Sequence, residues 1–206
     1  MNEHILQLLN RGNKMRLGPL MHEKGIPVPC YPDIRSLYSR PHYLRVLATE
    51  MALRIEHERI DLFAAIPFGG FPLAIALSMT MNRPFICVRP FEKHSLRPNI
   101  EGVWRKGQRV ALVDDSLTTG KAKQRAYELL VEAGMHPTHI LVIMEMSGFL
   151  AESKHRGWLK EKGVKVISLV TWHEWVHFME REGQFSKETT EALLRLLDNP
   201  PAWVKD

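Results

Sequence analysis

The chain has 206 residues, 45% hydrophobic and 25% charged, which fits one globular domain with a sizeable core. No apolar run reaches the roughly 20 residues of a membrane span, no signal-peptide core is present, and the only cysteines are Cys30 and Cys87. We therefore expect a cytoplasmic protein with no membrane segment. The charge of +5 suits a polyanionic ligand, but without a basic block nucleic-acid binding is not expected.

The N-terminal region combines two predicted helices with a segment rich in proline and glycine. Residues 1–12 have the apolar spacing of a short amphipathic helix. Residues 13–35 are expected to be irregular, as a flap over a site or a wrapping arm, because proline and glycine disfavour long helices and central strands. A second helix is predicted over 41–57, with Pro41 in its first turn.

From Asp61 onwards, apolar β-branched runs alternate with helical patterns. Strands are predicted at 62–67, 85–89, 109–113, 139–144 and 164–170. Helices are predicted at 71–81, 120–133, 149–162, 171–181 and 186–198, and residues 90–103 are expected to form a mobile loop. Repeated strand–helix units imply an α/β fold with a parallel, doubly wound sheet in a single domain.

The stretch Arg109–Ala122 (RVALVDDSLTTGKA) joins a predicted strand to a predicted helix through an acidic pair and small residues. Asp114 and Asp115 follow the strand, at the sheet edge where open α/β folds bind ligands. The amides of residues 117–122 can bind a phosphate, helped by the helix dipole. A P-loop is excluded, because Asp115 and Ala122 replace the glycine and the hydroxyl residue that it requires.

Two further loops follow predicted strands and face the same edge of the sheet. The segment Pro67–Pro72 contains paired glycines, whose amides can approach an anion closely. The segment Arg89–Gly102 brings the cationic or titratable side chains Arg89, Lys93, His94 and Arg97. Taken alone, the first segment is at least as well explained as a plain turn, and the second is better explained as a solvated loop. Together the three loops would place phosphate-binding amides, carboxylates for a diol and cations around one crevice.

Seven motifs between about residues 13 and 198 follow one another in a distinctive order. They are Pro29-x-Tyr31-x-Asp33-x-Arg35, Ser39-Arg40-Pro41, Ile66-Pro67-Phe68-Gly69-Gly70-x-Pro72-Leu73-Ala74, Val88-Arg89, Lys93-His94, Ile100-Glu101-Gly102 and Val113-Asp114-Asp115-x-x-Thr118-Thr119-Gly120. This order resembles the orotate phosphoribosyltransferases. The resemblance implies the type I phosphoribosyltransferase fold in one domain over residues 1–206: a mostly parallel α/β core at 61–170 flanked by helices, an N-terminal hood at about 1–40 and C-terminal helices at 171–206.

The resemblance also implies an activity, which is the transfer of ribose 5-phosphate from phosphoribosyl pyrophosphate (PRPP) to orotate. The products would be orotidine 5-monophosphate and pyrophosphate, Mg²⁺ would be the cofactor, and the enzyme would be a homodimer that exchanges its catalytic loop between subunits. No protein metal ligand is predicted.

The resemblance assigns roles to individual residues. Asp114 and Asp115 would hold the ribose hydroxyls and stabilise the positive charge that develops at C1. The remaining catalytic residues would be Lys93 and His94, which with Arg89 would neutralise the pyrophosphate, while Phe68 and Gly69 line it. The 5-phosphate would lie on Ser116, Leu117, Thr118, Thr119, Gly120, Lys121 and Ala122. Thr118 would also approach the base, together with Met146.

Several positions depart from the family pattern, mainly on the side of the base. Glu145-Met146 stands where the family has Asp-Arg, whose arginine binds the orotate carboxylate. Glu23 and Lys24 stand where the family has a lysine before the Ser-Gly of the N-terminal flap. Pro90 replaces a second basic residue, the spacing to His94 is one residue shorter, and Lys121 replaces a hydroxyl residue. Two alternatives therefore stay open: a transferase with another base acceptor, and a non-catalytic regulator that binds PRPP or RNA.

The string His173-Glu174-Trp175-Val176-His177 formally matches the zinc-binding pattern His-Glu-x-x-His. A zinc protease would need further ligands and a substrate cleft. We expect this segment to be a surface or packing helix.

Overall fold

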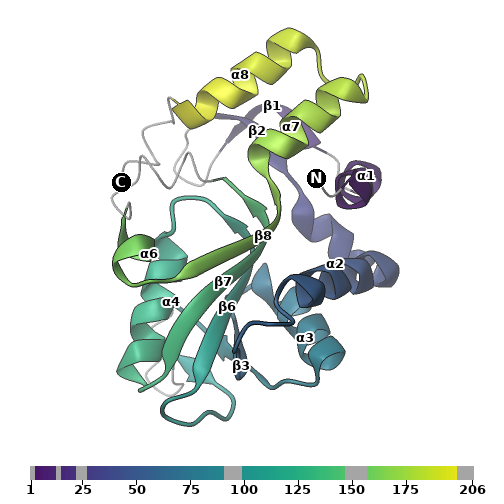
Figure 1. The fold of residues 1–206 in the computed structure, drawn as a ribbon. Helices are drawn as coiled ribbons and strands as arrows, with labels where there is room; N and C mark the ends of the chain where they lie inside the picture. The colour runs from purple at the N-terminus through teal and green to yellow at the C-terminus, as the bar shows by residue number, and fades with distance from the viewer. Residues whose placement is uncertain (1–2, 13–14, 22–26, 91–98, 147–156, 199–206) are drawn as a thin grey trace.

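A six-stranded sheet between two layers of helices, with a separate two-stranded hairpin, forms the fold (Figure 1). The computed structural model describes residues 3–12, 15–21, 27–90, 99–146 and 157–198. The strands of the large sheet are β3 (Leu62–Ala65), β4 (Phe85–Val88), β5 (Ile100–Glu101), β6 (Arg109–Leu117), β7 (His136–Glu145) and β8 (Lys165–Thr171). The helices are α1 (Glu3–Gly12), the 3-10 helix η1 (Ile34–Ser39), α2 (Pro41–Arg54), α3 (Gly70–Met81), α4 (Lys121–Glu132), α6 (Trp158–Glu161), α7 (Trp172–Arg181) and α8 (Lys187–Asp198).

The strand order of the large sheet is β5-β4-β3-β6-β7-β8. All neighbouring strands are parallel except β5, which pairs antiparallel with β4. The chain leaves β3 toward β4 and later enters β6 on the opposite side of β3. The carboxyl ends of β3 and β6 therefore form a topological switch point, where open α/β sheets leave a crevice for ligands. The predicted parallel, doubly wound sheet is confirmed.

Residues of the central strands alternate between two hydrophobic cores, as the period of a strand requires. On the face covered by α2 and α3 the core includes Phe63, Ala65, Ala111 and Val113. On the face covered by α4 and α6 it includes Leu62, Ala64, Val110 and Leu112 (Figure 1). Both faces are covered, which explains why these strands are apolar at nearly every position.

Helices α1, α7 and α8 and the hairpin lie beyond the carboxyl ends of the strands (Figure 1). Ile5 and Leu9 of α1 are buried in the same core as Trp172 and Trp175 of α7, so these two helices pack together. Helix α7 starts with a capping box, in which the Glu174 amide donates to Thr171 Oγ1 and the Thr171 amide donates to Glu174 Oε2. Within the described ranges, no helix is long and apolar enough to cross a membrane.

The prediction of an irregular chain over 13–35 is wrong where the structure describes this segment. Strands β1 (Met15–Met21) and β2 (Pro27–Pro32) pair antiparallel, and η1 follows them. Prolines are tolerated here because each strand of a two-stranded sheet has one edge that needs no partner. Residues 22–26, which include Glu23 and Lys24, lie outside the described residues.

Strand boundaries account for the other corrections. Strand β6 runs to Leu117 instead of ending at 113, because β7 pairs beside it as far as Glu145. Strand β7 begins at His136, and the short strand β5 lies inside the segment 90–103 that was expected to be a loop. Of the helix predicted at 149–162, residues 149–156 lie outside the described residues and α6 covers only its end.

Candidate functional site at the β3–β6 crevice

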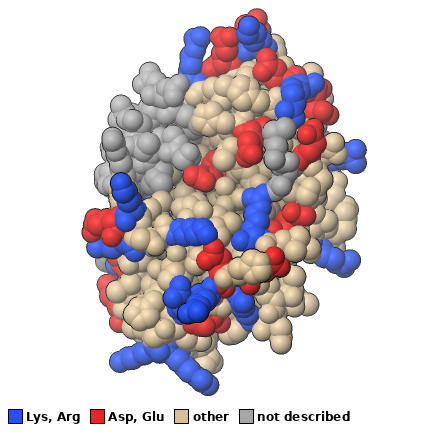
Figure 2. Space-filling model, in the orientation of Figure 1, with Lys and Arg blue, Asp and Glu red and all other residues tan. Residues whose placement is uncertain are grey.

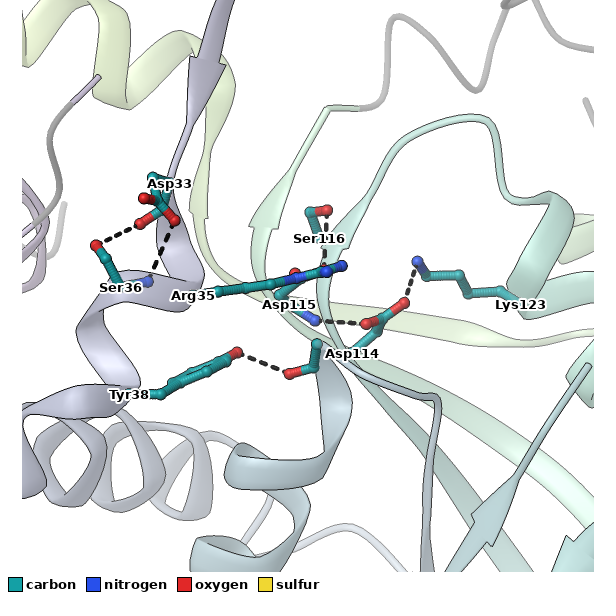
Figure 3. A network of polar contacts seen from close by, with 9 residues as sticks. Asp33, Arg35, Ser36, Tyr38, Asp114, Asp115, Ser116 and Lys123 are labelled. Atoms are coloured by element: carbon teal, nitrogen blue, oxygen red, sulfur yellow. Dashed lines mark hydrogen bonds and ion pairs between the residues drawn. The ribbon is translucent and has the colours of Figure 1, made fainter. Parts of the chain in front are cut away.

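The two adjacent carboxylates lie within strand β6 and not in the loop after it, which corrects the sequence-based placement. Asp114 continues the alternation of Val110 and Leu112 toward α4, while Asp115 continues that of Ala111 and Val113 toward η1 (Figure 3). Each residue is only 6% exposed. Strand alternation therefore gives the two carboxylates different surroundings although they are neighbours in sequence.

Asp115 is paired with a cation from the N-terminal region. Arg35 Nε, from η1, donates to Asp115 Oδ2 at 2.6 Å, and Ser116 Oγ donates to Asp115 Oδ1 at 3.2 Å. Burial alone would raise the pKa of Asp115, but the hydrogen bond from Arg35 and the charge of Lys123 outweigh it and hold this pKa below its usual value. Asp115 is therefore ionised at neutral pH.

Asp114 is paired with Lys123, which lies in the first turn of α4. Lys123 Nζ donates to Asp114 Oδ2 at 2.5 Å, and the Asp115 amide donates to Asp114 Oδ1 at 2.9 Å. Burial raises the pKa of Asp114 to about 6, an effect that Lys123 opposes and the charge of Asp115 reinforces. With Arg35, the cluster then contains two carboxylates and two cations (Figure 3).

Gly69, in the loop between β3 and α3, lies against both carboxylates. A Cβ atom at Gly69 would overlap the carboxyl group of Asp115 and lie 2.8 Å from Asp114 Oδ1, so only glycine fits without a shift. Tyr38 Oη of η1 donates to Gly69 O at 2.9 Å. Burial, followed by the charges of Asp115 and Asp114, raises the pKa of Tyr38 well above its usual value, so this hydroxyl stays a donor.

Phe68 precedes Gly69 in the same loop. The peptide bond between Pro67 and Phe68 is cis, and the Phe68 side chain is 74% exposed. Because Gly69 lies against both carboxylates, its neighbour Phe68 is at the same edge of the sheet as the acidic pair.

The segment between β6 and α4 consists of Thr118, Thr119 and Gly120. Gly120 precedes α4 with a φ of 80°, a left-handed conformation that favours glycine. Lys121 is exposed at the first position of this 12-residue helix. Ala122, at the second position, packs against the hydrophobic core that α4 covers. The amides here belong to a helix N-terminus, which favours an anion.

Ser116 and Leu117 were expected in this phosphate loop but belong to β6. The Leu117 side chain is fully buried, and its carbonyl accepts from the Met146 amide at 2.9 Å. The continued pairing with β7 explains the difference, because it holds residues 116 and 117 in the sheet.

Of the cationic residues that were predicted to bind pyrophosphate, the structure describes only Arg89. Arg89 follows β4 directly, and its Nη2 atom lies 2.7 Å from Glu101 Oε1 of β5. Lys93, His94 and Arg97 lie outside the described residues. On the face shown in Figure 2, basic and acidic side chains are interleaved and do not gather into a basic stripe.

The end of strand β7, next to the end of β6, presents Glu145 and Met146. Met146 is 7% exposed, and Glu145 Oε2 accepts from Ser168 Oγ at 3.2 Å. Arg54, the last residue of α2, donates to the carbonyls of Ser168 and Leu169 on the neighbouring strand β8. The end of β7 therefore offers a thioether and a carboxylate.

No cluster of three or more His, Cys, Asp or Glu side chains in the described ranges could hold a metal ion. His173 and His177 are exposed on α7, and Glu174 between them caps that helix. The His-Glu-x-x-His pattern therefore falls on a surface face, as expected.

Three residues of the site received no role from the sequence: Arg35, Tyr38 and Lys123. Arg35 stands in the motif Pro29-x-Tyr31-x-Asp33-x-Arg35, which placed it near the site without naming a partner. Lys123 occupies the buried face of α4 with Ala126 and Leu130, and this break in an apolar pattern was a usable signal. Tyr38 left no comparable signal.

No protein-family model matches the chain. The orotate phosphoribosyltransferase of Pyrococcus furiosus is 32% identical to it over 177 residues, covering 84% of this chain and 94% of that protein. The UMP synthase structure of Leishmania donovani superimposes with a TM-score of 0.80 at 26% identity, over 95% of this chain and 42% of that one. The orotate phosphoribosyltransferase structure of Aeropyrum pernix gives a TM-score of 0.68 at 23% identity, over 87% of this chain and 99% of that one.

Proposed function

The chain belongs to the orotate phosphoribosyltransferase family, and from this premise we propose that it transfers ribose 5-phosphate from PRPP to orotate in pyrimidine biosynthesis. The products would be orotidine 5-monophosphate and pyrophosphate. The main support from the geometry is the buried pair Asp114–Asp115 beside Gly69 and the N-terminus of α4, at the switch point between β3 and β6.

In this proposal the 5-phosphate of the donor lies at the start of α4. The amides of residues 118–121 and the helix dipole favour a dianion there, and the exposed side chain of Lys121 adds a positive charge. The ribose would then extend toward Asp114 and Asp115, which accept its hydroxyls. Ionised carboxylates near the sugar also stabilise the positive charge that develops at C1 as pyrophosphate leaves.

Mg²⁺ is part of the proposal as the cofactor implied by the family. Such ions keep several waters and bind through substrate phosphates, with few protein ligands. This fits a site whose described residues offer no metal-binding cluster, because the pyrophosphate of the donor can supply the oxygens. When bound, the ion would offset the negative charge of the leaving pyrophosphate. Activity that persists in excess chelator would contradict this part of the proposal.

We also propose a cytoplasmic homodimer in which the loop carrying Lys93 and His94 serves the neighbouring subunit. The test is complementation between two impaired variants, Asp115→Asn and the double variant Lys93→Ala/His94→Ala, with the residual rate of each variant alone subtracted. Mixed dimers recover about a quarter to a half of the wild-type rate if the loop acts across subunits, and recover none if it acts within its own.

A second candidate function is transfer to a base that lacks a carboxylate. The observation that favours it is the pair Glu145–Met146 at the end of β7, since a thioether cannot form a charge-assisted hydrogen bond. An arginine at this position would form a bidentate contact with the orotate carboxylate, and the loss of that contact costs about 1.5–3 kcal/mol. Orotate would then bind more weakly than an uncharged pyrimidine.

The deciding experiment measures pyrophosphate release from PRPP and Mg²⁺ with orotate, uracil, cytosine and purine bases. Release with orotate supports the first proposal, and release only with another base supports the second. PRPP binding without release on any base would contradict both and favour a non-catalytic protein that binds PRPP or RNA.

A further inference from the structure

Lys123 is a buried cation at the donor side of the site. It is the third residue of α4, and its side chain runs back to strand β6, where Nζ lies 2.5 Å from Asp114 Oδ2 (Figure 3). The two side chains are only 8% and 9% exposed. A lysine is rarely buried this deeply unless it is paired. Its position is therefore defined by Asp114.

Three other polar groups of the described residues lie near the acidic pair and contact Asp115 or the backbone. From η1, Arg35 donates to Asp115 and Tyr38 donates to the Gly69 carbonyl; from β6, Ser116 donates to Asp115. Among the described residues, Lys123 is the cation whose ion pair reaches Asp114.

Two neighbouring buried carboxylates resist being ionised together. Burial disfavours each charge, and the negative charge of one opposes ionisation of the other. Asp115 is already held ionised by Arg35. Asp114 would accordingly take up a proton near neutral pH without a cation of its own, and a protonated carboxyl would stabilise a developing positive charge poorly.

We propose that Lys123 is a positioning residue that keeps Asp114 ionised and turned toward the sugar of the donor. The inference rests on the proposed function, because that sugar belongs to PRPP. Lys123 Nζ binds Oδ2 while the Asp115 amide binds Oδ1, so the orientation of the carboxylate is fixed at both oxygens. Each oxygen keeps a second lone pair with which to accept a ribose hydroxyl.

The test compares Lys123→Met, which removes the charge but keeps the length of the side chain, with Lys123→Arg, which keeps the charge. The matched control is Arg125→Met on the same helix, which breaks a half-exposed ion pair with Glu128. We expect kcat/KM for PRPP in Lys123→Met to fall about tenfold at pH 7 and to recover as the pH rises and Asp114 ionises again. The Arg125→Met and Lys123→Arg profiles should follow the wild type. An equal loss for Lys123→Met at every pH indicates a merely structural role and overturns the proposal.

A second measurement is independent of turnover. The carboxyl ¹³C resonance of Asp114, assigned with Asp114→Asn, reports ionisation of the free protein. We expect Asp114 to be ionised at pH 7 in the wild type and largely protonated in Lys123→Met. The proposal is overturned if Asp114 is ionised in both proteins. It is also overturned if Asp114 is protonated in the wild type. The wild-type measurement can be made even if Lys123→Met fails to fold. Absence of turnover in the wild type with every base would instead count against the proposed function.

Discussion

The proposed donor side and the proposed acceptor side of the crevice differ in the charges that they carry. On the donor side, Asp114 and Asp115 are both buried and each is paired with a cation from a different layer of the fold. On the acceptor side, one strand further along the sheet, Met146 and Glu145 offer no positive charge to a substrate. The comparison shows that the donor can be inferred from side chains that the fold holds in place, while the acceptor depends on positions where this chain departs from its family.

The largest expected effect is on the donor side, in Asp115→Asn. The substitution removes a charge that stabilises the transition state while keeping the shape of the side chain, so turnover should fall about tenfold or more. Initial rates of pyrophosphate release measure it. The matched control is Asp61→Asn at the opposite edge of the sheet, where the exposed Asp61 side chain accepts from the Arg109 amide. Wild-type rates in Asp115→Asn would refute the role of the acidic pair.

Gly69→Ala should weaken donor binding about tenfold, because the new methyl group displaces the Asp115 carboxyl group. Titration calorimetry with PRPP measures the affinity. Gly70→Ala provides the contrast, because its Cβ would overlap the Val113 carbonyl and should chiefly lower the melting temperature. Unchanged PRPP affinity in a folded Gly69→Ala protein would contradict the close approach of Gly69 to the site.

On the acceptor side, Met146→Arg should raise the kcat/KM ratio of orotate to uracil. The gain should be about three- to tenfold, below the full value of a charge-assisted contact because the arginine must also be buried. Competition between the two bases measures the ratio, and Met146→Leu controls for the loss of the thioether. A ratio that is equal in the two variants would show that β7 does not contact the base.

The smallest effect is expected at the amino edge of the sheet, at His139. Burial lowers the pKa of His139 below 6.5, although Glu58, 3.1 Å from Nε2, opposes the shift. The unfolded chain therefore binds this proton more tightly, and stability contributed by the neutral ring is lost as the pH falls through about 6.5.

His139→Gln should accordingly reduce the pH dependence of the free energy of unfolding between about pH 5 and pH 7. The difference should be no more than about 1 kcal/mol, and transferase rates should not change. Urea denaturation across this pH range measures it. His136→Gln, at an exposed position of the same strand, is the control. A change in transferase rate would mean that the amino edge is coupled to the site.

The sequence predicted the parallel sheet and the meeting of Gly69 with the acidic pair, because apolar periodicity and loop order determine both. It placed the end of β6 too early, since Asp-Asp-Ser is a poor strand former and only pairing with β7 extends the strand. The partners of the two carboxylates were also missed. Arg35 lies 80 residues from Asp115, so that contact depends on the tertiary fold.

The most direct test of the central claim is the rate of pyrophosphate release from PRPP and Mg²⁺ when orotate is added to the wild-type protein. We expect release that depends on orotate and saturates with both substrates. Saturable binding of PRPP with no release in the presence of orotate would contradict the proposed transfer to orotate.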